Sequence, residues 1–62
     1  MKRKSTLRNW RIVDMGDYYC LVGDVFNDPR FPDGDRVRTS MLQRIDFEKG
    51  KAETLNTIYK LI

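Results

Sequence analysis

The stretch from Gly23 to Ser40 restricts the possible folds more than any other part of the chain. It holds both prolines of the sequence, Pro29 and Pro32, and the turn dipeptide Asp33-Gly34. Proline fixes φ and removes a backbone donor, and glycine supplies a positive φ, so this stretch favours a loop of one defined shape. β-Branched and aromatic residues flank it, as is typical of strands. The sequence therefore predicts a small β domain built around a shaped polar loop.

Four strands are predicted, over residues 7–13, 18–26, 36–48 and 52–62. The second is apolar on both faces, whereas the third alternates apolar and polar residues with the period of a half-buried strand. Four strands joined by short turns form an antiparallel meander, which we expect to curl into a small open, SH3-like barrel. Gly23 inside the second strand predicts either a bulge or a close approach of another backbone. The predicted core consists of Trp10, Ile12, Leu21, Val25, Val37, Met41, Ile45, Phe47, Leu55, Tyr59 and Leu61.

With 62 residues, one cysteine and no histidine, the chain is expected to form one domain without an internal disulfide or a structural zinc site. A chain this short buries only about 60% of the surface that it exposes when unfolded, so an isolated fold is marginal. The predicted strands also leave four apolar residues outside the core, which indicates a partner surface. These residues are Val22, Phe26, Leu42 and Ile58. We therefore expect a homo-oligomer.

Met1 to Thr6 is polar and basic, and we predict a disordered tail there, with the β domain over residues 7–62. The tail is interpreted as a solubilising end, or alternatively as an arm that touches an anionic partner. The sequence has no apolar stretch of membrane-spanning length and no signal peptide, and its free thiol fits a reducing compartment. These features predict a soluble protein of the cytoplasm, or of the host cytoplasm if a phage encodes it.

The net charge of +3 is unevenly distributed along the chain. Residues 1–13 hold five basic side chains and no acid, residues 14–35 hold six aspartates and one arginine, and residues 36–62 hold six basic and three acidic side chains. Basic ends around an acidic middle argue against a uniformly basic coat for nucleic acid.

Enzyme chemistry has little support in the sequence. Without histidine, the usual general base near neutral pH is missing. Cys20 lies in an apolar strand with no imidazole to activate it. Asp28, Asp33 and Asp35 match only a fragment of a calcium loop, and aspartates in turns commonly cap backbone amides. We therefore predict no catalytic activity, no metal and no cofactor.

Basic residues near the loop favour an anion-binding site. Arg30 lies in the loop, and Arg36 and Arg38 project from one face of the third strand. Arginine binds phosphate oxygens in a bidentate manner, and an aromatic ring such as Phe31 can stack on a base. A turn near residues 49–50 would bring the last strand opposite the third, with Thr57 near Leu42 and Tyr59 near Ser40. The predicted ligand-binding residues are Arg30, Phe31, Arg36, Arg38, Thr39, Ser40 and Asn56. The alternative is that Arg36 and Arg38 form surface ion pairs with Asp33, Asp35 or Glu53.

The sequence Asp-Pro-Arg-Phe-Pro-Asp-Gly followed by Val-x-Thr-Ser, within Val25 to Ser40, resembles a pattern in small uncharacterised phage and bacterial β proteins. The resemblance covers most of residues 22–61, including an end similar to Thr57–Leu61. By size and class alone, the chain is also similar to phage sponge proteins, which sequester nucleotide signals of bacterial immunity.

The first functional hypothesis is therefore a non-enzymatic, phage-type binding module that captures a phosphate-bearing nucleotide signal as an anti-defence sponge. One alternative is a small β-barrel that binds nucleic acid through the basic tail and the same arginines. The other is a protein inhibitor that docks on a host enzyme with its leftover apolar face.

Overall fold

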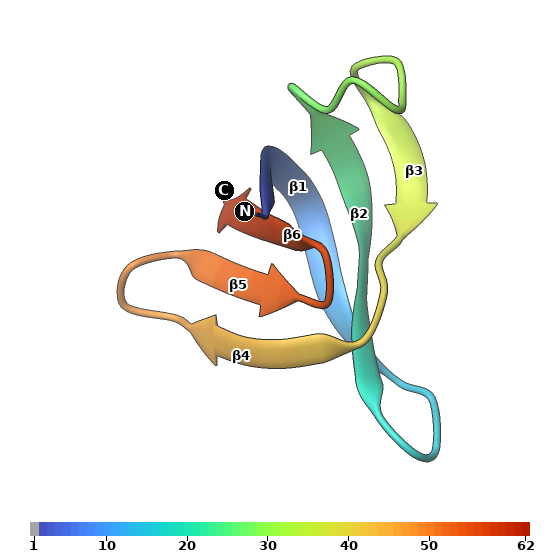
Figure 1. The fold of residues 1–62 in the computed structure, drawn as a ribbon, viewed down its shortest axis with the longest axis vertical. Helices are drawn as coiled ribbons and strands as arrows, with labels where there is room; N and C mark the ends of the chain where they lie inside the picture. The colour runs from blue at the N-terminus through green and yellow to red at the C-terminus, as the bar shows by residue number, and fades with distance from the viewer. Residues whose placement is uncertain (1) are drawn as a thin grey trace.

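The computed structural model describes residues 2–62, which form six β-strands in one sheet (Figure 1). The all-β prediction is confirmed. The order of strands across the sheet is β3-β2-β1-β6-β5-β4, with β1 and β6 parallel and all other neighbours antiparallel. No helix within residues 2–62 has the length and apolar character to cross a membrane. The strands are β1 (Arg3–Asp14), β2 (Tyr19–Phe26), β3 (Asp35–Arg38), β4 (Leu42–Asp46), β5 (Lys51–Thr54) and β6 (Thr57–Leu61).

The predicted four-stranded antiparallel meander is wrong, because two of its strands are interrupted. The strand predicted over residues 36–48 is divided at residues 39–41 into β3 and β4, which lie at opposite edges of the sheet. The strand predicted over residues 52–62 is divided at residues 55–56 into β5 and β6. Apolar and polar residues keep alternating through both corners. The sequence pattern therefore predicts one uninterrupted strand in each place. At the first corner the Thr39 hydroxyl accepts a hydrogen bond from the Leu21 amide, which replaces a bond between strands.

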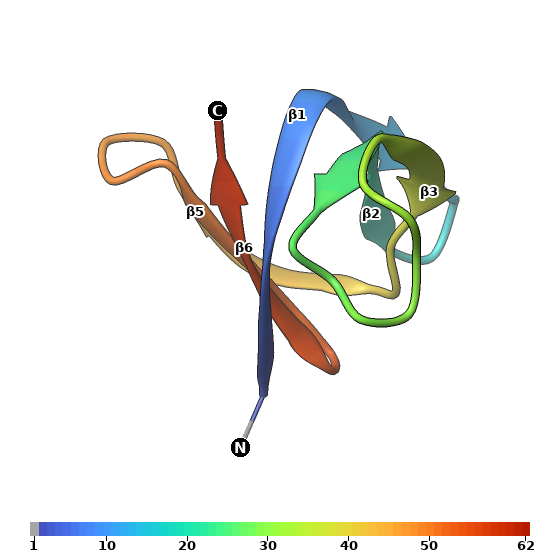
Figure 2. The ribbon, with the colours of Figure 1, turned by 90° about the horizontal axis from the view of Figure 1, so that it is seen from above.

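The long strand β1 joins the two halves of the sheet. Its beginning pairs with β6 from Arg3↔Thr57 to Leu7↔Leu61. Its pairing with β2 runs from Thr6↔Phe26 to Asp14↔Tyr19, so the two pairings overlap at Thr6 and Leu7. Figure 2 shows β1 and β6 running in the same direction. A bulge between Arg8 and Arg11, where Asn9 has a φ of 49°, interrupts the pairing with β2. The sheet bends but is not closed into a barrel, and its six strands of mixed direction do not match the predicted four-stranded open, SH3-like barrel.

The prediction of a disordered tail over residues 1–6 is wrong for residues 2–6, and Met1 lies outside the described residues. Arg3 begins β1, and Ser5 is buried. The ammonium of Lys2 lies 2.5 Å from the Glu53 carboxylate and donates to the Thr54 carbonyl at 2.7 Å. The strand that orders this segment is more than 50 positions away in the sequence, so no local pattern indicates the pairing.

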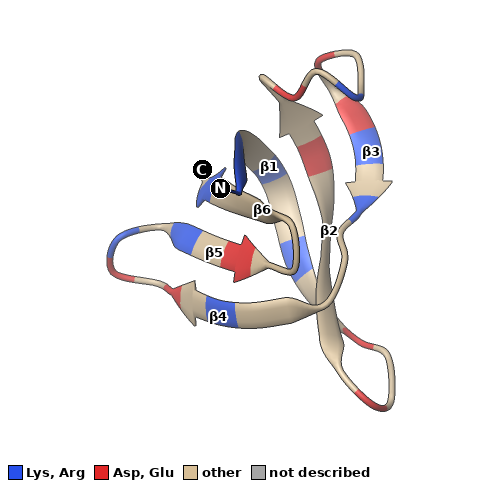
Figure 3. Cartoon of the chain, viewed as in Figure 1, with Lys and Arg blue, Asp and Glu red and all other residues tan. Residues whose placement is uncertain are grey.

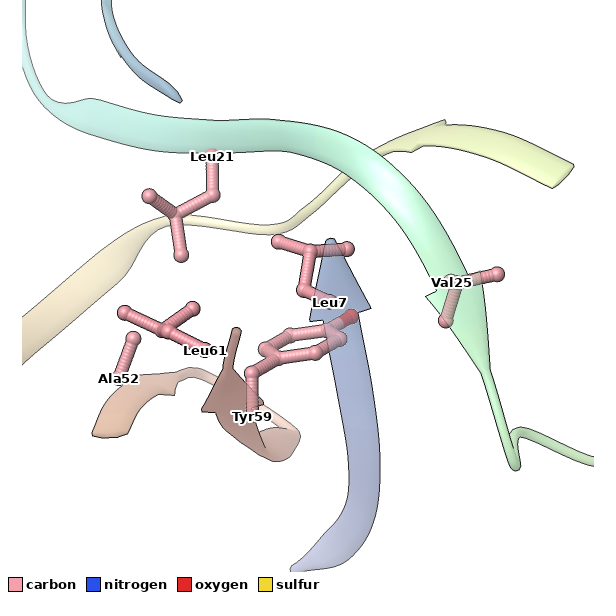
Figure 4. Close-up of a cluster of buried hydrophobic side chains, with 6 residues drawn as sticks. All are labelled: Leu7, Leu21, Val25, Ala52, Tyr59 and Leu61. Atoms are coloured by element: carbon pink, nitrogen blue, oxygen red, sulfur yellow. The ribbon is translucent and has the colours of Figure 1, made fainter. Parts of the chain in front are cut away.

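The core is a cluster of six side chains between the two halves of the sheet, where residues of β5 and β6 point toward those of β1 and β2 (Figure 4). Gly23 makes this packing possible, because a Cβ there would lie 2.7 Å from Cγ of Leu7 and 2.9 Å from the Arg8 carbonyl oxygen. The close backbone approach predicted at Gly23 is thus confirmed. The cluster consists of Leu7, Leu21, Val25, Ala52, Tyr59 and Leu61.

The predicted core is correct in part. Leu21, Val25, Tyr59 and Leu61 are buried, and Trp10, Val37 and Ile45 pack against them as half-buried residues. Four predicted core residues are instead exposed: Ile12, Met41, Phe47 and Leu55. Three of these lie at corners or turns, and Ile12 lies beyond the part of β1 that pairs with β6. Val22, Phe26, Leu42 and Ile58, expected to be left outside the core, are half-buried.

Candidate functional site

The loop between β2 and β3 is organised around the buried side chain of Asp28. This carboxylate is fully inaccessible and accepts two hydrogen bonds from the Arg30 guanidinium, at 3.0 and 2.8 Å. It also accepts bonds from the Ser5 hydroxyl and from the Arg30 amide, both at 2.9 Å. The hydrogen bonds to Arg30 hold the pKa of Asp28 well below its ordinary value, although burial opposes the shift. The predicted single loop shape therefore arises from an internal ion pair.

Arg30, the central residue of the predicted site, is occupied by this ion pair. Its Nη2 also lies 3.4 Å from the Thr57 hydroxyl, which ties the loop to β6. The pair with Asp28 raises the pKa of Arg30. Phe31 is half-buried against the core, and its ring centre lies 5.1 Å from the Arg30 guanidinium carbon. Both residues therefore hold the loop on the sheet, and the guanidinium is not free to clamp an anion.

Arg36 and Arg38 lie on edge strand β3 and share one of its faces. Arg36 donates to the Asp24 carboxylate at 3.0 Å, so its ion pair is with Asp24 rather than with any of the three predicted acids. A hydrogen bond from Asn9 makes the largest contribution to lowering the pKa of Asp24, and a hydrogen bond from Arg36 makes the next. Within residues 2–62, Arg38 takes part in none of the side-chain hydrogen bonds or ion pairs. Of the three predicted arginines, Arg38 alone keeps a fully available charge.

The hydroxyls and the amide predicted for the site do not join the arginines. Thr39 is buried and bonds the Leu21 amide at 3.0 Å and the Ser40 carbonyl at 2.9 Å. Ser40 donates to the side-chain oxygen of Asn56 at 3.3 Å, which links the two corners of the sheet. These contacts are structural, and the predicted polar pocket is not assembled.

The predicted register between the third and last strands is also wrong. Leu42 lies opposite Thr54, whereas Thr57 lies opposite Arg3 on β1. The predicted register requires one continuous strand after the turn at Gly50, but the corner at residues 55–56 separates β5 from β6. The turn near residues 49–50 does form, with Gly50 in the left-handed conformation at a φ of 65°.

Aspartates in the turns act as caps, as predicted. The Asp28 carboxylate accepts the Arg30 amide, and Asp33 accepts the Asn27 amide at 2.9 Å. In the part of the chain that the structure describes, no three His, Cys, Asp or Glu side chains gather as metal ligands would.

A different set of basic residues gathers on the outer face of the sheet, defined here as the face opposite the core. One row across the strands reads Thr6 (β1), Lys60 (β6), Lys51 (β5) and Asp46 (β4). The next row reads Lys4, Ile58, Glu53 and Arg44. Figure 3 shows basic residues on β1, β5 and β6. Two adjoining depressions of about 130 and 270 Å³ occupy this face and share Lys51 and Ile58. We call Lys4, Lys49, Lys51, Lys60 and the central Ile58 the lysine hollow.

The charges of the lysine hollow are largely uncompensated. Lys51 and Lys60 lie directly opposite one another, an arrangement of like charges that destabilises a sheet. No acid lies within 4.0 Å of any of the four ammonium groups in the described structure. Two acids line the larger depression. Glu53 is already paired with Lys2 and, at 3.6 Å, with Arg44, whereas Asp46 lies opposite Lys51 without forming a salt bridge. The lysine hollow can therefore present several positive charges at once to an anion.

Sequence reasoning missed the lysine hollow because its members come from distant segments. Lys4 lies in the predicted tail, and it reaches Ile58 only through the parallel pairing of β1 with β6. One signal was present. Ile58 is predicted to lie outside the core, and the period of two places Lys60 on the same face, where an isolated apolar residue beside charges is unusual.

Comparisons of the chain with protein families, with curated proteins and with solved structures found no match. The resemblance to small phage proteins therefore stays a prediction.

Proposed function

We propose that this protein is a non-enzymatic binding module whose lysine hollow contacts the phosphate backbone of a nucleic acid. The observation that carries the proposal is the group of four lysines around Ile58, from β1, β5, β6 and the turn before β5. Asp46 and Glu53 also line the larger depression, but neither forms a salt bridge with these lysines in the described structure. Lysines that neutralise phosphates release counterions, which supplies most of the affinity in sequence-independent binding. The repulsion between Lys51 and Lys60 would be relieved by such a ligand.

The shape of the face favours a polymer. Neighbouring strands lie about 4.8 Å apart, so the lysines on β1, β6 and β5 extend over roughly 10 Å. A lysine ammonium is a point charge without the planar fork of arginine, which suits contact with a backbone rather than readout of one group. The depressions are open on the outer face, whereas small-molecule sites enclose most of their ligand.

Capture of a free phosphate-bearing nucleotide, as in an anti-defence sponge, is the second candidate. Its support is the larger depression of about 270 Å³, close to the lower end of the range for small-molecule sites, roughly 300 Å³. The arginines that first suggested this function contribute less support, because Arg30 and Arg36 are paired within the chain.

The test is an anisotropy titration of a labelled single-stranded oligonucleotide about a dozen nucleotides long. Lys51→Glu combined with Lys60→Glu should lower the affinity at least about tenfold, because two phosphate contacts become repulsive. The matched control is Arg11→Glu combined with Arg38→Glu, which changes the net charge equally at residues outside the lysine hollow.

If the affinity falls equally in both double variants, the loss comes from the change in net charge and not from the lysine hollow. That result would contradict the proposal. Unlabelled ATP in the same titration separates the two candidates. If the nucleotide displaces the oligonucleotide at micromolar concentration, the ligand is a free nucleotide.

A further inference from the structure

The sheet has two edges without a neighbouring strand in residues 2–62, namely β3 and β4. An edge strand exposes a row of unpaired backbone donors and acceptors, which is a template for pairing with another chain. We propose that β4 pairs antiparallel with β4 of a second copy, about a two-fold axis at Ile45, so that two sheets become one. This inference does not depend on the proposed function.

Charge complementarity supports this pairing. In a register centred on Ile45, Arg44 of each copy lies opposite Asp46 of the other, so the two-fold axis creates two pairs of opposite charge. Both side chains project from the outer face, as their partners Glu53 and Lys51 on β5 do. The Arg44 side chain is 81% exposed, so it is available to a partner despite its 3.6 Å contact with Glu53.

Other registers of β4 are unfavourable. If one copy of β4 slid by a single residue along the other, side chains of the outer face would lie opposite side chains of the inner face. A continuous strand pair does not allow this. A register centred on Arg44 or on Asp46 would place that charged residue opposite itself. The sequence Arg-Ile-Asp therefore specifies a single self-pairing.

The other edge is not suited to self-pairing. Centred on Val37, β3 would place Arg36 opposite Arg38, and centred on either arginine it would place that arginine opposite itself. Like charges directly opposite destabilise a strand pair. Of the two edges, β4 is thus the one able to accept a second copy.

Apolar surface beside β4 would be covered by the same pairing. Ile45 is half-buried on the inner face and would meet its own copy. Phe47, immediately after β4, is 66% exposed, and its ring stacks on Trp10 with centres 6.3 Å apart. In the proposed register Phe47 falls beside Gln43 of the second copy. An exposed aromatic stack next to an open edge is the kind of surface that a partner strand shields.

The experiment measures molar mass by light scattering during gel filtration at tens of micromolar chain. The parent is expected to have twice the chain mass. Arg44→Asp places two acids opposite each other, and Asp46→Arg places two bases opposite each other, so each should raise the dimer dissociation constant at least tenfold. The matched control Arg38→Asp, on β3, should remain dimeric.

Mixing the Arg44→Asp and Asp46→Arg proteins restores an acid opposite a base at both positions, so the mixture should regain the dimer mass. Thermal melts check each fold, since Asp46 also accepts the Lys49 amide at 3.1 Å. If Asp46→Arg does not fold, the comparison of Arg44→Asp with Arg38→Asp decides the test alone. A monomeric parent, equal dissociation by Arg44→Asp and Arg38→Asp, or a mixture that stays monomeric would each overturn the proposal.

Discussion

The Arg30 guanidinium binds the Asp28 carboxylate through two hydrogen bonds, at 3.0 and 2.8 Å, where that carboxylate has no solvent exposure. The pair connects the loop between β2 and β3 to the sheet, because Ser5 on β1 bonds the same carboxylate. The buried carboxylate of Asp28 thus holds the loop against β1. Arg30 connects the same pair to Thr57 at the beginning of β6.

Arg30→Ala should therefore destabilise the fold. Removing one partner of a buried pair leaves an uncompensated charge, which costs about 3–5 kcal/mol, and we expect about 3 because a third of the Arg30 side chain is exposed. Urea unfolding measures the loss. Arg38→Ala is the control and should change the unfolding free energy by less than about 0.5 kcal/mol. Equal stability of the two variants would show that the pair contributes nothing.

Acid should weaken the fold through Asp28. Its pKa is lowered in the folded state from an ordinary value of 3.8, so its contribution is present above that value and is lost as pH falls toward the lowered pKa. The free energy of unfolding should decrease from about pH 5 downward, with a smaller decrease in Asp28→Asn, which cannot titrate. An Asp28→Asn protein as acid-sensitive as the parent would assign the effect to other carboxylates.

Thr39→Val tests the corner between β3 and β4. The variant keeps the shape but leaves the buried Leu21 amide without its 3.0 Å acceptor, a loss of about 1–3 kcal/mol. Thr39→Ser retains the hydroxyl and should lose much less. If both variants melt at the same temperature, the corner is held by the backbone bond from Thr39 to Leu21 alone.

Gly23→Ala should be destabilising through overpacking. The added methyl would lie 2.7 Å from Cγ of Leu7 and 2.9 Å from the Arg8 carbonyl, and the carbonyl belongs to a paired strand that cannot move easily. We expect a loss of about 1–3 kcal/mol in urea unfolding. A neutral substitution would mean that β1 and β2 separate at the bulge without consequence.

Local features of the fold follow from the sequence, and long-range ones do not. The strand character of residues 19–26 and the left-handed Gly16 and Gly50 are set by neighbouring residues. The glycine at position 23 marks the close approach of β1, because a side chain there would clash with Leu7 and Arg8. The parallel pairing of β1 with β6 and the corners at Thr39 and Asn56 depend on contacts distant in sequence, which periodicity does not encode.

The burial of the Asp28–Arg30 pair was not predicted for a related reason, because it depends on the distant Ser5 on β1. Arg30 looked available because its partner Asp28, two residues earlier, resembled an ordinary turn cap rather than a buried ion. Lys4, Lys51 and Lys60 looked unrelated because no reading of single strands brings them together.

The salt dependence of oligonucleotide binding tests the central claim most directly. Each lysine on a single-strand phosphate contributes a slope of about −0.7 in log affinity against log salt, so the four lysines of the lysine hollow predict a slope of about −3. Lys60→Ala should make the slope shallower by about 0.7, whereas Arg11→Ala should leave it unchanged. A parent slope near zero, or the same change in both variants, would contradict nucleic-acid binding at the lysine hollow.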